Sequence, residues 1–491
     1  MRGWSDMSAV VLLGLLAGTV GADVALPVTA SSVHDPRYMP EFAVDGDPAT
    51  RWASQGADGE WLALDLGRTL RVAAVSIHWE HAYPAKFAVE TSTDGEDWTV
   101  VQEAAGVDGP QSLDLTPSDA RHVRVRTTEP GPFNITSIWE ISSPDEDVLA
   151  ALGGIADRIS AARAEAMRET AERFAQTVSD MGAEEIVFAI RKPGVDGHWY
   201  GNFGYYARST GEKCYRTGSS KLCALNAKTG DVRVIFEDAE GSIRDPKVHY
   251  DARKILFSYL RAGTESYHLY EINVDGTGLT QITDGNWDDI EPTYLPGGGI
   301  MFASSRCFRW VNCWLTPVAT LYRCDGDGGN VRMISCNVEH DNTPWVLPDG
   351  RVLYMRWEYV DRSQVHYHHL WTCNPDGTEQ MVFYGNMIPG IAMLDAKPIP
   401  GTRKIVSIFS PGHGQHEHQG PVTILDPGDG PDNPASARTI AHANNYRDPY
   451  PLSESMFLVA RGAEIVLMDG NGNTRPVYQL SGDEISEGLW A

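Results

Sequence analysis

Cysteine and basic residues are scarce in this sequence. Seven cysteines occur among 491 residues, none of them before Cys214, and no two are spaced as CxxC. The missing CxxC excludes a zinc ribbon and a CxxCH haem attachment site, and the odd number leaves at least one thiol free or bound to a metal. Lys and Arg total 40 against 66 Asp and Glu, and the formal net charge of −26 argues against nucleic acid or an anionic membrane as a partner.

Long apolar runs are also missing, except at the N-terminus. Residues 9–20 are mostly apolar, follow Arg2, and lead to the small residues Val20-Gly21-Ala22. This pattern is typical of a cleavable signal peptide, so we expect residues 1–22 to be removed on export to the periplasm or the extracellular space. A retained anchor is the alternative interpretation. No later segment reaches 18 apolar residues, so we expect no membrane span in the mature chain.

Residues 23–142 read as short strands separated by turns. Strand patterns at 61–66, 72–77, 87–92 and 122–126 predict a β-sandwich. The phrases at 43–52, 61–67 and 92–98, with their order and spacing, resemble the discoidin (F5/8 type C) family. The resemblance implies an eight-stranded jelly roll, and bacterial members of this family include many carbohydrate-binding modules.

The same resemblance implies a structural calcium ion. Ca²⁺ prefers several oxygen ligands from one tight loop and a distant carboxylate. Asp45, Asp47 and Thr50 would supply the loop, and Glu140 on the closing strand at 138–141 would complete the site. An ordinary Asp-Gly turn is the alternative interpretation.

A sugar site needs an exposed aromatic side chain with polar neighbours on loops. Trp79, His81 and Tyr83 lie near a predicted loop and are the candidate ligand-binding residues. The family often buries the position of Trp79 in the core, so a structural or protein-binding role of this domain is the alternative.

Residues 143–182 carry a helical pattern. Ser143-Pro144-Asp145-Glu146 combines a Ser cap, Pro at the first helical position and Glu three residues after the cap. Apolar residues then recur every three to five positions up to Met181, which predicts one amphipathic spacer helix of about 35 residues. We expect it to pack along a neighbouring domain, with self-association as a coiled coil as the alternative.

Residues 183–491 repeat two phrases, and this repetition predicts the fold. Each unit begins with an Asp-containing phrase and ends with a strand closed by an Asp-Gly turn. The first phrase occurs as Asp289-Ile290-Glu291-Pro292, Asp341-Asn342-Thr343-Pro344, Asp395-Ala396-Lys397-Pro398 and Asp448-Pro449-Tyr450-Pro451, with Asp245-Pro246-Lys247-Val248 as a weaker copy. Four-stranded sheets that stack radially form a β-propeller. We predict six blades and an all-β fold class apart from the spacer. Residues 483–487 would either begin a seventh unit or complete the first blade.

Two features of the predicted propeller could bind metal. The Asp residues that begin the units should lie near the central axis, where several carboxylates could hold a cation; capping of a tight turn is the alternative. His413, His416 and His418 lie within six residues, and three imidazoles with an open fourth position suit Zn²⁺, Mn²⁺ or Cu²⁺. A polar loop with incidental histidines is the alternative. A second histidine cluster spans 366–369, with His340 in the same unit.

The phrases at 267–273, 307–314, 340–345, 356–362 and 410–414 look like an exported propeller family related to the middle domain of the hydrazine synthase alpha subunit. In hydrazine synthase this propeller lies beside a c-type haem and contributes to a zinc site. The resemblance implies a zinc role for Cys307 with His198, while a Cys307–Cys313 disulfide is a further option. Because CxxCH is missing, we expect no covalently attached haem and no hydrazine chemistry.

The spacing of His413, His416 and His418 is also similar to the metal-binding motif of TolB-like propellers that are oligogalacturonate lyases. The leading functional prediction is an exported protein that binds an extracellular glycan or protein partner and holds a divalent metal in its propeller. A metal-dependent polysaccharide lyase of the oligogalacturonate-lyase type and a non-catalytic interaction scaffold are the alternatives.

Overall fold

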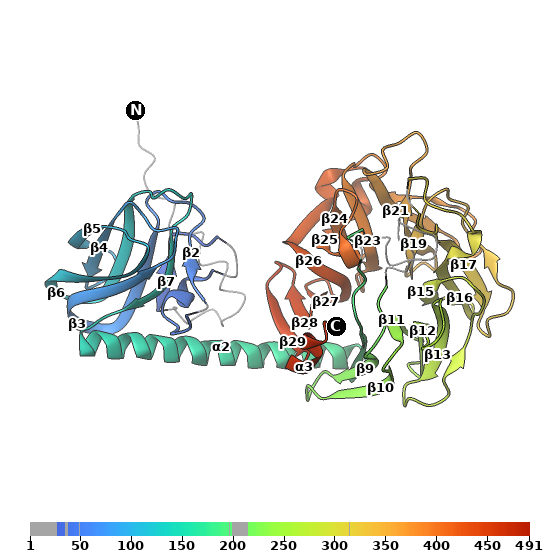
Figure 1. The fold of residues 1–491 in the computed structure, drawn as a ribbon, viewed down its shortest axis with the longest axis horizontal. Coiled ribbons are helices and arrows are strands. Elements are labelled where there is room, and N and C mark those ends of the chain that lie inside the picture. Colours follow the sequence, from blue (N-terminus) through green and yellow to red (C-terminus); the bar gives the residue numbers. More distant parts are fainter. Residues whose placement is uncertain (1–26, 35–37, 49, 196, 199–214, 314) are drawn as a thin grey trace. The chain divides into compact units, whose positions relative to one another are not determined.

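The computed structural model describes residues 27–34, 38–48, 50–195, 197–198, 215–313 and 315–491 (Figure 1). The chain divides into two compact units, residues 1–169 and residues 170–491. The predicted signal peptide lies outside the described residues. In the part of the chain that the structure describes, no helix is long and apolar enough to cross a membrane.

The first unit is an antiparallel β-sandwich. Its strands are β1 (Val28–Ala30), β2 (Trp52–Ala53), β3 (Trp61–Trp79), β4 (Lys86–Ser92), β5 (Thr99–Ala105), β6 (Gly109–Glu129) and β7 (Ser137–Ser142). The short helix η1 (Pro40–Ala43) lies between β1 and β2 along the chain. The pairing order is β2-β7-β3-β6-β4-β5, and β1 pairs with β3. Bulges in the β3–β6 pairing bend these two long strands, which lets each contribute to more than one side of the sandwich.

The helix α2 (Glu146–Asp180) lies within the predicted 143–182 range. Its first half buries Val148, Leu152, Ile155 and Ile159 in the core of the sandwich. Its last turns bury Phe174 and Val178 in a core of the second unit. The Asp145 carboxylate accepts hydrogen bonds from the backbone N–H groups of Ala73 and Ala74, at 2.9 and 3.1 Å, and so fixes the start of the helix on β3.

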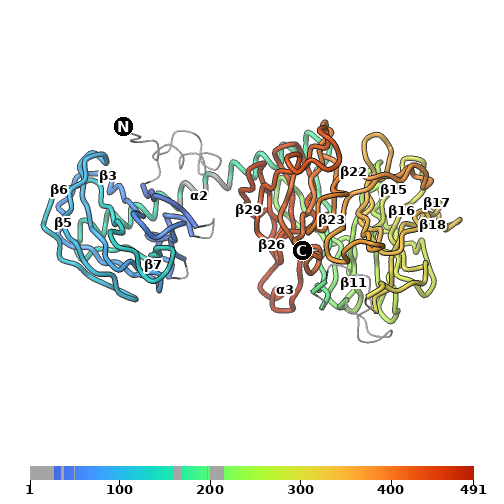
Figure 2. Tube along the Cα trace, turned by 90° about the horizontal axis from the view of Figure 1, so that it is seen from above, coloured from blue at the N-terminus to red at the C-terminus, as the bar shows by residue number. Residues whose placement is uncertain are grey.

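The second unit consists of successive antiparallel sheets, which follow one another along the chain in the ribbon and the Cα trace (Figures 1 and 2). The first three contain β8 (Glu185–Ile190), β9 (Ser220–Asn226) and β10 (Val232–Asp238); then β11 (Ser242–Val248), β12 (Lys254–Leu260), β13 (His268–Asn273) and β14 (Thr280–Gln281); then β15 (Asp289–Tyr294), β16 (Gly299–Ser304), β17 (Thr320–Asp325) and β18 (Arg332–Met333).

The later strands join into one extended hydrogen-bonded array. They are β19 (Asp341–Val346), β20 (Val352–Trp357), β21 (Tyr367–Cys373), β22 (Met381–Tyr384), β23 (Ile391–Pro398), β24 (Ile405–Pro411), β25 (Gly420–Leu425), β26 (Ala437–Ser453), β27 (Met456–Arg461), β28 (Glu464–Asp469) and β29 (Thr474–Gln479). The 17-residue β26 pairs with β25 through its first half and with β27 through its second half. One strand therefore serves two successive units of the repeat.

A bulge with left-handed backbone conformation marks the first strand of five successive units. Its residues, all with φ between 46° and 57°, are Asp245, Glu291, Thr343, Asp395 and Asp448. The pairing register shifts at each of these positions. The predicted alignment, which equated Asp289 and Asp341 with Asp395 and Asp448, was therefore displaced by two residues. The backbone bulge is the constant feature of the repeat. The Asp-to-Pro phrase does not stand at a constant distance from the bulge.

The end of the chain packs on the first sheet of the second unit. Residues 483–487 do not begin a seventh unit, because Gly482–Ser486 forms the helix α3, which starts at a capping box of Ser481 and Glu484. Trp490 forms a β-bridge with Arg191, and the Lys221 ammonium lies 2.6 Å from the Glu484 carboxylate. Side chains of β8 and β9 share a buried core with side chains of β27 and β28.

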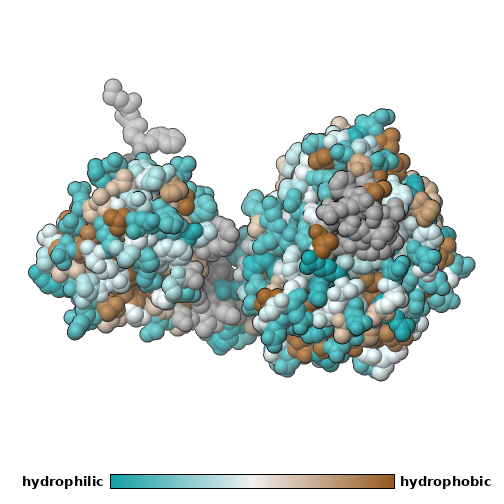
Figure 3. Space-filling view, viewed as in Figure 1, coloured by the Kyte–Doolittle hydropathy of each residue, from teal (hydrophilic) through white to brown (hydrophobic). Residues whose placement is uncertain are grey.

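On the face seen in Figure 3, hydrophobic residues are scattered among hydrophilic ones.

Candidate functional site

Three segments meet at one end of the sandwich because of strand register. β7 lies between β2 and β3, and Ile138 pairs both with Trp52 and with Trp79. Arg51, which precedes β2, and the loop that follows β3 are thereby placed beside the start of β7. The backbone confirms this, since the N–H of Glu80 donates to the carbonyl of Ser137 at 3.2 Å.

Arg51 is the central side chain of this end of the sandwich. Its guanidinium lies 4.6 Å from the ring centre of Tyr38 and 5.2 Å from that of Trp139. It also forms an ion pair with Glu80 at 3.0 Å. The cation is therefore fixed against aromatic faces by stacking and by charge. We call Tyr38, Arg51, Glu80, His81 and Trp139 the loop-80 surface.

The three predicted ligand-binding residues have different environments. Trp79 is only 1% exposed, donates its indole N–H to Gln111 at 3.0 Å and packs against Phe87, so it belongs to the core and cannot contact a ligand. His81 is exposed, with Nδ1 2.8 Å from the Asp108 carboxylate. Tyr83 is half-buried and packs on the core of the sandwich.

Two glycines hold the loop that carries His81 and Tyr83. A Cβ atom at Gly106 would lie 2.2 Å from the carbonyl oxygen of Pro84, and one at Gly131 would lie 2.0 Å from that of Tyr83. Neither distance is tolerable for a real Cβ, so the close approach requires glycine at both positions.

The predicted calcium ligands form a compact cluster of oxygen atoms. The Asp45 carboxylate accepts hydrogen bonds from Thr50 Oγ1, at 2.9 and 3.1 Å, and from the N–H of Asp47 at 3.1 Å. Asp47 turns its carbonyl oxygen to the same Thr50 hydroxyl, at 3.1 Å. Burial raises the pKa of Glu140 to about 7, and the charge of Asp45 adds to this effect. Oxygen atoms of this kind are the ligands that Ca²⁺ prefers, but the side chains of Asp45, Asp47 and Glu140 are not grouped as metal ligands in the described part of the chain.

The predicted three-histidine metal site is not assembled. His413 Nδ1 lies 3.0 Å from His368 Nε2, His416 Nε2 lies 3.0 Å from the carbonyl of Gly194, and His418 Nδ1 lies 3.0 Å from Asp395. The short helix η4 (His416–His418) has left-handed conformations at Glu417 and His418, which send adjacent side chains in different directions. Among the described residues, no three His, Cys, Asp or Glu side chains are grouped as metal ligands.

The remaining predicted ligands also serve other contacts. His340 accepts a hydrogen bond from the N–H of Ala319 at 3.0 Å, and burial lowers its pKa to about 3. The Cys307 thiol donates to the carbonyl of Val318 at 3.1 Å; Cys307 and Cys313 are both free, so the optional disulfide is absent. His198 lies with its ring centre 6.2 Å from that of His413.

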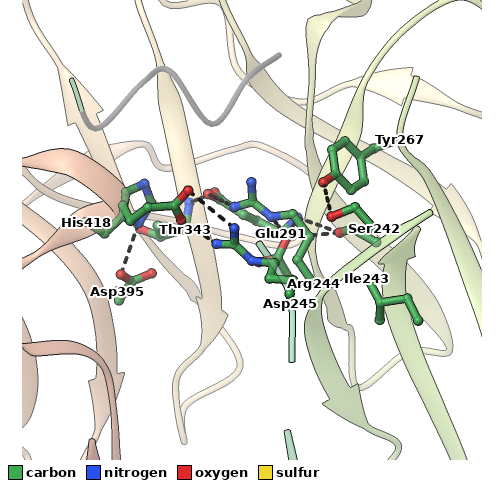
Figure 4. Close-up of polar contacts among 12 residues, drawn as sticks. Ser242, Ile243, Arg244, Asp245, Tyr267, Glu291, Thr343, Asp395 and His418 are labelled. Atoms are coloured by element: carbon green, nitrogen blue, oxygen red, sulfur yellow. Dashed lines mark hydrogen bonds and ion pairs between the residues drawn. The ribbon is translucent and has the colours of Figure 1, made fainter. Parts of the chain in front are cut away.

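The bulge residues of the second unit line a pocket of about 350 Å³, its open mouth included. Their polar groups bind one another from unit to unit. The N–H of Glu291 donates to Asp245 at 3.1 Å, the N–H of Thr343 donates to Glu291 at 2.6 Å, and Asp395 pairs with His418 (Figure 4). Asp245 and Glu291 therefore connect neighbouring units, whereas Asp395 pairs with His418 of its own unit.

The pocket contains three further residues that were not predicted from the sequence, Lys247, Trp345 and Lys397. Each stands two positions after a bulge residue. Alignment of the units on the bulge places all three in one column, whereas alignment on the Asp-to-Pro phrase groups Lys247 with Lys397 and separates Trp345 from them.

Comparisons with known proteins match these two units in part. Residues 27–141 match the family model of the F5/8 type C domain. Hydrazine synthase subunit alpha of Kuenenia stuttgartiensis is 24% identical over 309 residues, which cover 50% of this chain and 37% of that protein. The solved structure of Kuenenia stuttgartiensis hydrazine synthase has 20% sequence identity and a TM-score of 0.49, over 60% of this chain and 45% of that chain.

Two further similarities concern shorter regions. The polysaccharide lyase 8 family protein HylA of Enterococcus faecalis is 35% identical over 75 residues, or 15% of this chain and 5% of that protein. A chitosan-binding module of a chitosanase/glucanase from Paenibacillus sp. IK-5 is 32% identical, covers 23% of this chain and 90% of that module, and has a TM-score of 0.22.

These matches show what each part of the chain resembles. The chain combines an antiparallel β-sandwich with a longer unit of repeated antiparallel sheets. Its residues 27–141 are an F5/8 type C domain, and it contains a region that resembles hydrazine synthase subunit alpha, so both predicted resemblances are confirmed. The chain spans well under half the length of that subunit.

Proposed function

We propose that this protein is an exported glycan-binding protein, and that its F5/8 type C domain holds the sugar at the loop-80 surface. The observation that carries the proposal is the arrangement around Arg51, whose guanidinium is held against the rings of Tyr38 and Trp139 beside the Glu80 carboxylate. The similarity to a polysaccharide lyase 8 family protein over 75 residues supports a role with carbohydrates. Export would follow from the signal-peptide pattern at 1–22.

The chemistry of the loop-80 surface suits a sugar ring. Aromatic rings pack against the apolar C–H face of a sugar, and fixed charged groups bind its hydroxyl groups. Arg51 has five N–H donors, and its described hydrogen-bond partners, Glu80 and Ser137, leave others to donate. His81 adds an exposed imidazole at the edge of the same surface.

A calcium ion would support this surface. Asp45, Asp47, Thr50 and Glu140 would hold it, and its charge would offset the repulsion between the facing carboxylates. Because Thr50 directly precedes Arg51, fixing the loop would also fix the guanidinium.

The repeated sheets of the second unit are proposed to be the six blades of a β-propeller over residues 183–491. The shared core of the first and last sheets and the Arg191–Trp490 bridge support closure of the ring. The bulge at equivalent positions of five units supports an equivalent place for each inner strand.

The test is a glycan array probed with the full chain from residue 23, with and without a calcium chelator. We expect a defined set of glycans to bind, and binding to fall at least tenfold in Arg51→Ala and on chelation. Arg121→Ala is the matched control, because Arg121 pairs with Asp65 away from the loop-80 surface and should bind as the unmodified chain does. Absence of any bound glycan, or full binding by Arg51→Ala, contradicts the proposal.

A further inference from the structure

The pocket at the bulges of the second unit contains two lysines that face one aromatic ring. Lys247 Nζ lies 3.8 Å from the ring centre of Trp345, and Lys397 Nζ lies 5.2 Å from it. Lys397 is only 6% exposed, and Lys247 is half-buried. Two ammonium groups thus lie against the same ring, and water is largely excluded from one of them.

Neither ammonium has a carboxylate partner within 4 Å among the described residues. The hydrogen bond of Lys397 Nζ goes to the backbone carbonyl of Asp395, at 3.3 Å. Burial lowers the pKa of Lys247 to about 8, and the charge of Lys397 lowers it further, against the opposing charges of Asp245, Asp448 and Asp395. A buried ammonium without an anion is costly, and the repulsion within the pair adds to that cost.

The carboxylates of the pocket do not compensate this pair directly. Asp245 lies 2.9 Å from the guanidinium of Arg244, and Asp395 is held by His418. Burial raises the pKa of Glu291 to about 7, which reduces the negative charge that it carries at neutral pH. Asp448 is exposed and forms no ion pair with the described residues. Glu291 also lies 3.7 Å from the Arg244 guanidinium, so neither lysine has a carboxylate within ion-pair distance among the described residues.

The geometry points to a binding site for a hydroxylated monocarboxylate, the chemistry of a sugar acid, with its carboxylate between Lys247 and Lys397. The two oxygen atoms of one carboxylate can accept a hydrogen bond from each ammonium group. Asp448 can accept hydrogen bonds from the hydroxyl groups of the ligand. The ligand could arrive as a free sugar acid or as the end of an acidic polysaccharide.

The test is calorimetric titration of the full chain at pH 7 with D-glucuronate and D-galacturonate. D-glucose supplies the hydroxyl groups without the carboxylate, acetate supplies the carboxylate without the hydroxyl groups, and sulfate tests for simple anion binding. We expect at least one uronate to bind more than tenfold more tightly than all three. An oligogalacturonate arm distinguishes the sources, since tighter binding of the oligomer indicates a polysaccharide end and equal binding indicates a free acid.

Variants locate the site. Lys397→Met and Lys247→Met should each weaken uronate binding roughly 10- to 100-fold, because each removes a charged hydrogen bond to the carboxylate. Lys247→Met, at the half-buried position, keeps the test valid if Lys397→Met does not fold. Lys254→Met is the control, because Lys254 pairs with Glu271 outside the pocket. Equal affinity for acetate or sulfate, unchanged binding in both lysine variants, or loss of uronate binding in Arg51→Ala overturns the proposal.

Discussion

Glu417 connects the first sheet of the second unit to the turn between β24 and β25, and its replacement by glutamine should destabilise this unit strongly. The side chain is 3% exposed, pairs with the guanidinium of Arg191 and accepts the N–H of Gly194 at 2.5 Å. Glu417→Gln leaves Arg191, which is largely buried, without its counter-charge. Loss of one partner from a buried pair costs about 3–5 kcal/mol, or a fall in melting temperature of roughly 6–10 °C.

The pH dependence of this effect has a definite sign. Burial alone would raise the pKa of Glu417, but the charge and hydrogen bonds of Arg191 hold it well below the usual range. A carboxyl group with a depressed pKa in the folded state stabilises the protein above its unfolded pKa, near 4.5, and loses that contribution as the pH falls below it. The difference between the unmodified chain and Glu417→Gln should therefore be full at pH 7 and shrink below pH 4.5.

Scanning calorimetry of the full chain at several pH values measures both effects. Glu185→Gln is the control, since Glu185 forms an exposed ion pair with Arg233 at 2.8 Å, and loss of such a pair costs less than about 1 kcal/mol. Replacing both Arg191 and Glu417 by methionine should recover part of the loss. Equal melting shifts for Glu417→Gln and Glu185→Gln, or a difference that does not change with pH, would contradict a stabilising role of the buried Arg191–Glu417 ion pair.

Three further outcomes follow from the structure. Trp79→Ala should lower the stability of the first unit by about 3–5 kcal/mol, which chemical denaturation measures, because it empties a core position; a change in glycan binding without loss of stability would contradict this. Gly131→Ala should displace the loop at Tyr83 and weaken glycan binding, whereas an unchanged array profile would show that the loop tolerates the extra carbon. Burial opposes a charged His418, but Asp395 raises its pKa to about 9. Its contribution to stability is therefore complete below pH 6.5 and lost as the pH rises through 9, so denaturation midpoints should fall over this range and should not do so in His418→Gln.

The order of the elements was predictable because its signals are local. The Asp-Gly turns, the apolar strands and the capped start of the spacer each depend on neighbouring residues, and the structure places sheets and helix α2 where these patterns lie. The bulge depends instead on backbone conformation. Asp245, Glu291 and Thr343 share a positive φ without sharing a side chain, so matching of residue types misaligned the units by two positions.

The site residues were harder to predict, because side-chain direction and burial depend on the whole fold. Spacing suggested that His413, His416 and His418 converge, but left-handed backbone at residues 417 and 418 separates them. Trp79 looked like a loop residue, yet the register of β3 on β7 carries it into the core. The four calcium ligands were predicted from the resemblance to a family whose motif has a fixed spacing. In the structure, Asp45 is hydrogen-bonded to Thr50 and lies near Glu140.

The most direct test of glycan binding at the loop-80 surface is the affinity of Arg51→Lys for the glycans that the array selects, measured by calorimetry with calcium present. Lysine keeps the positive charge but loses the planar group that contacts Tyr38 and Trp139. We expect the affinity to fall at least tenfold while the melting temperature of the first unit changes little. Full affinity in Arg51→Lys would show that the arrangement of Arg51 between the two rings does not bind the sugar.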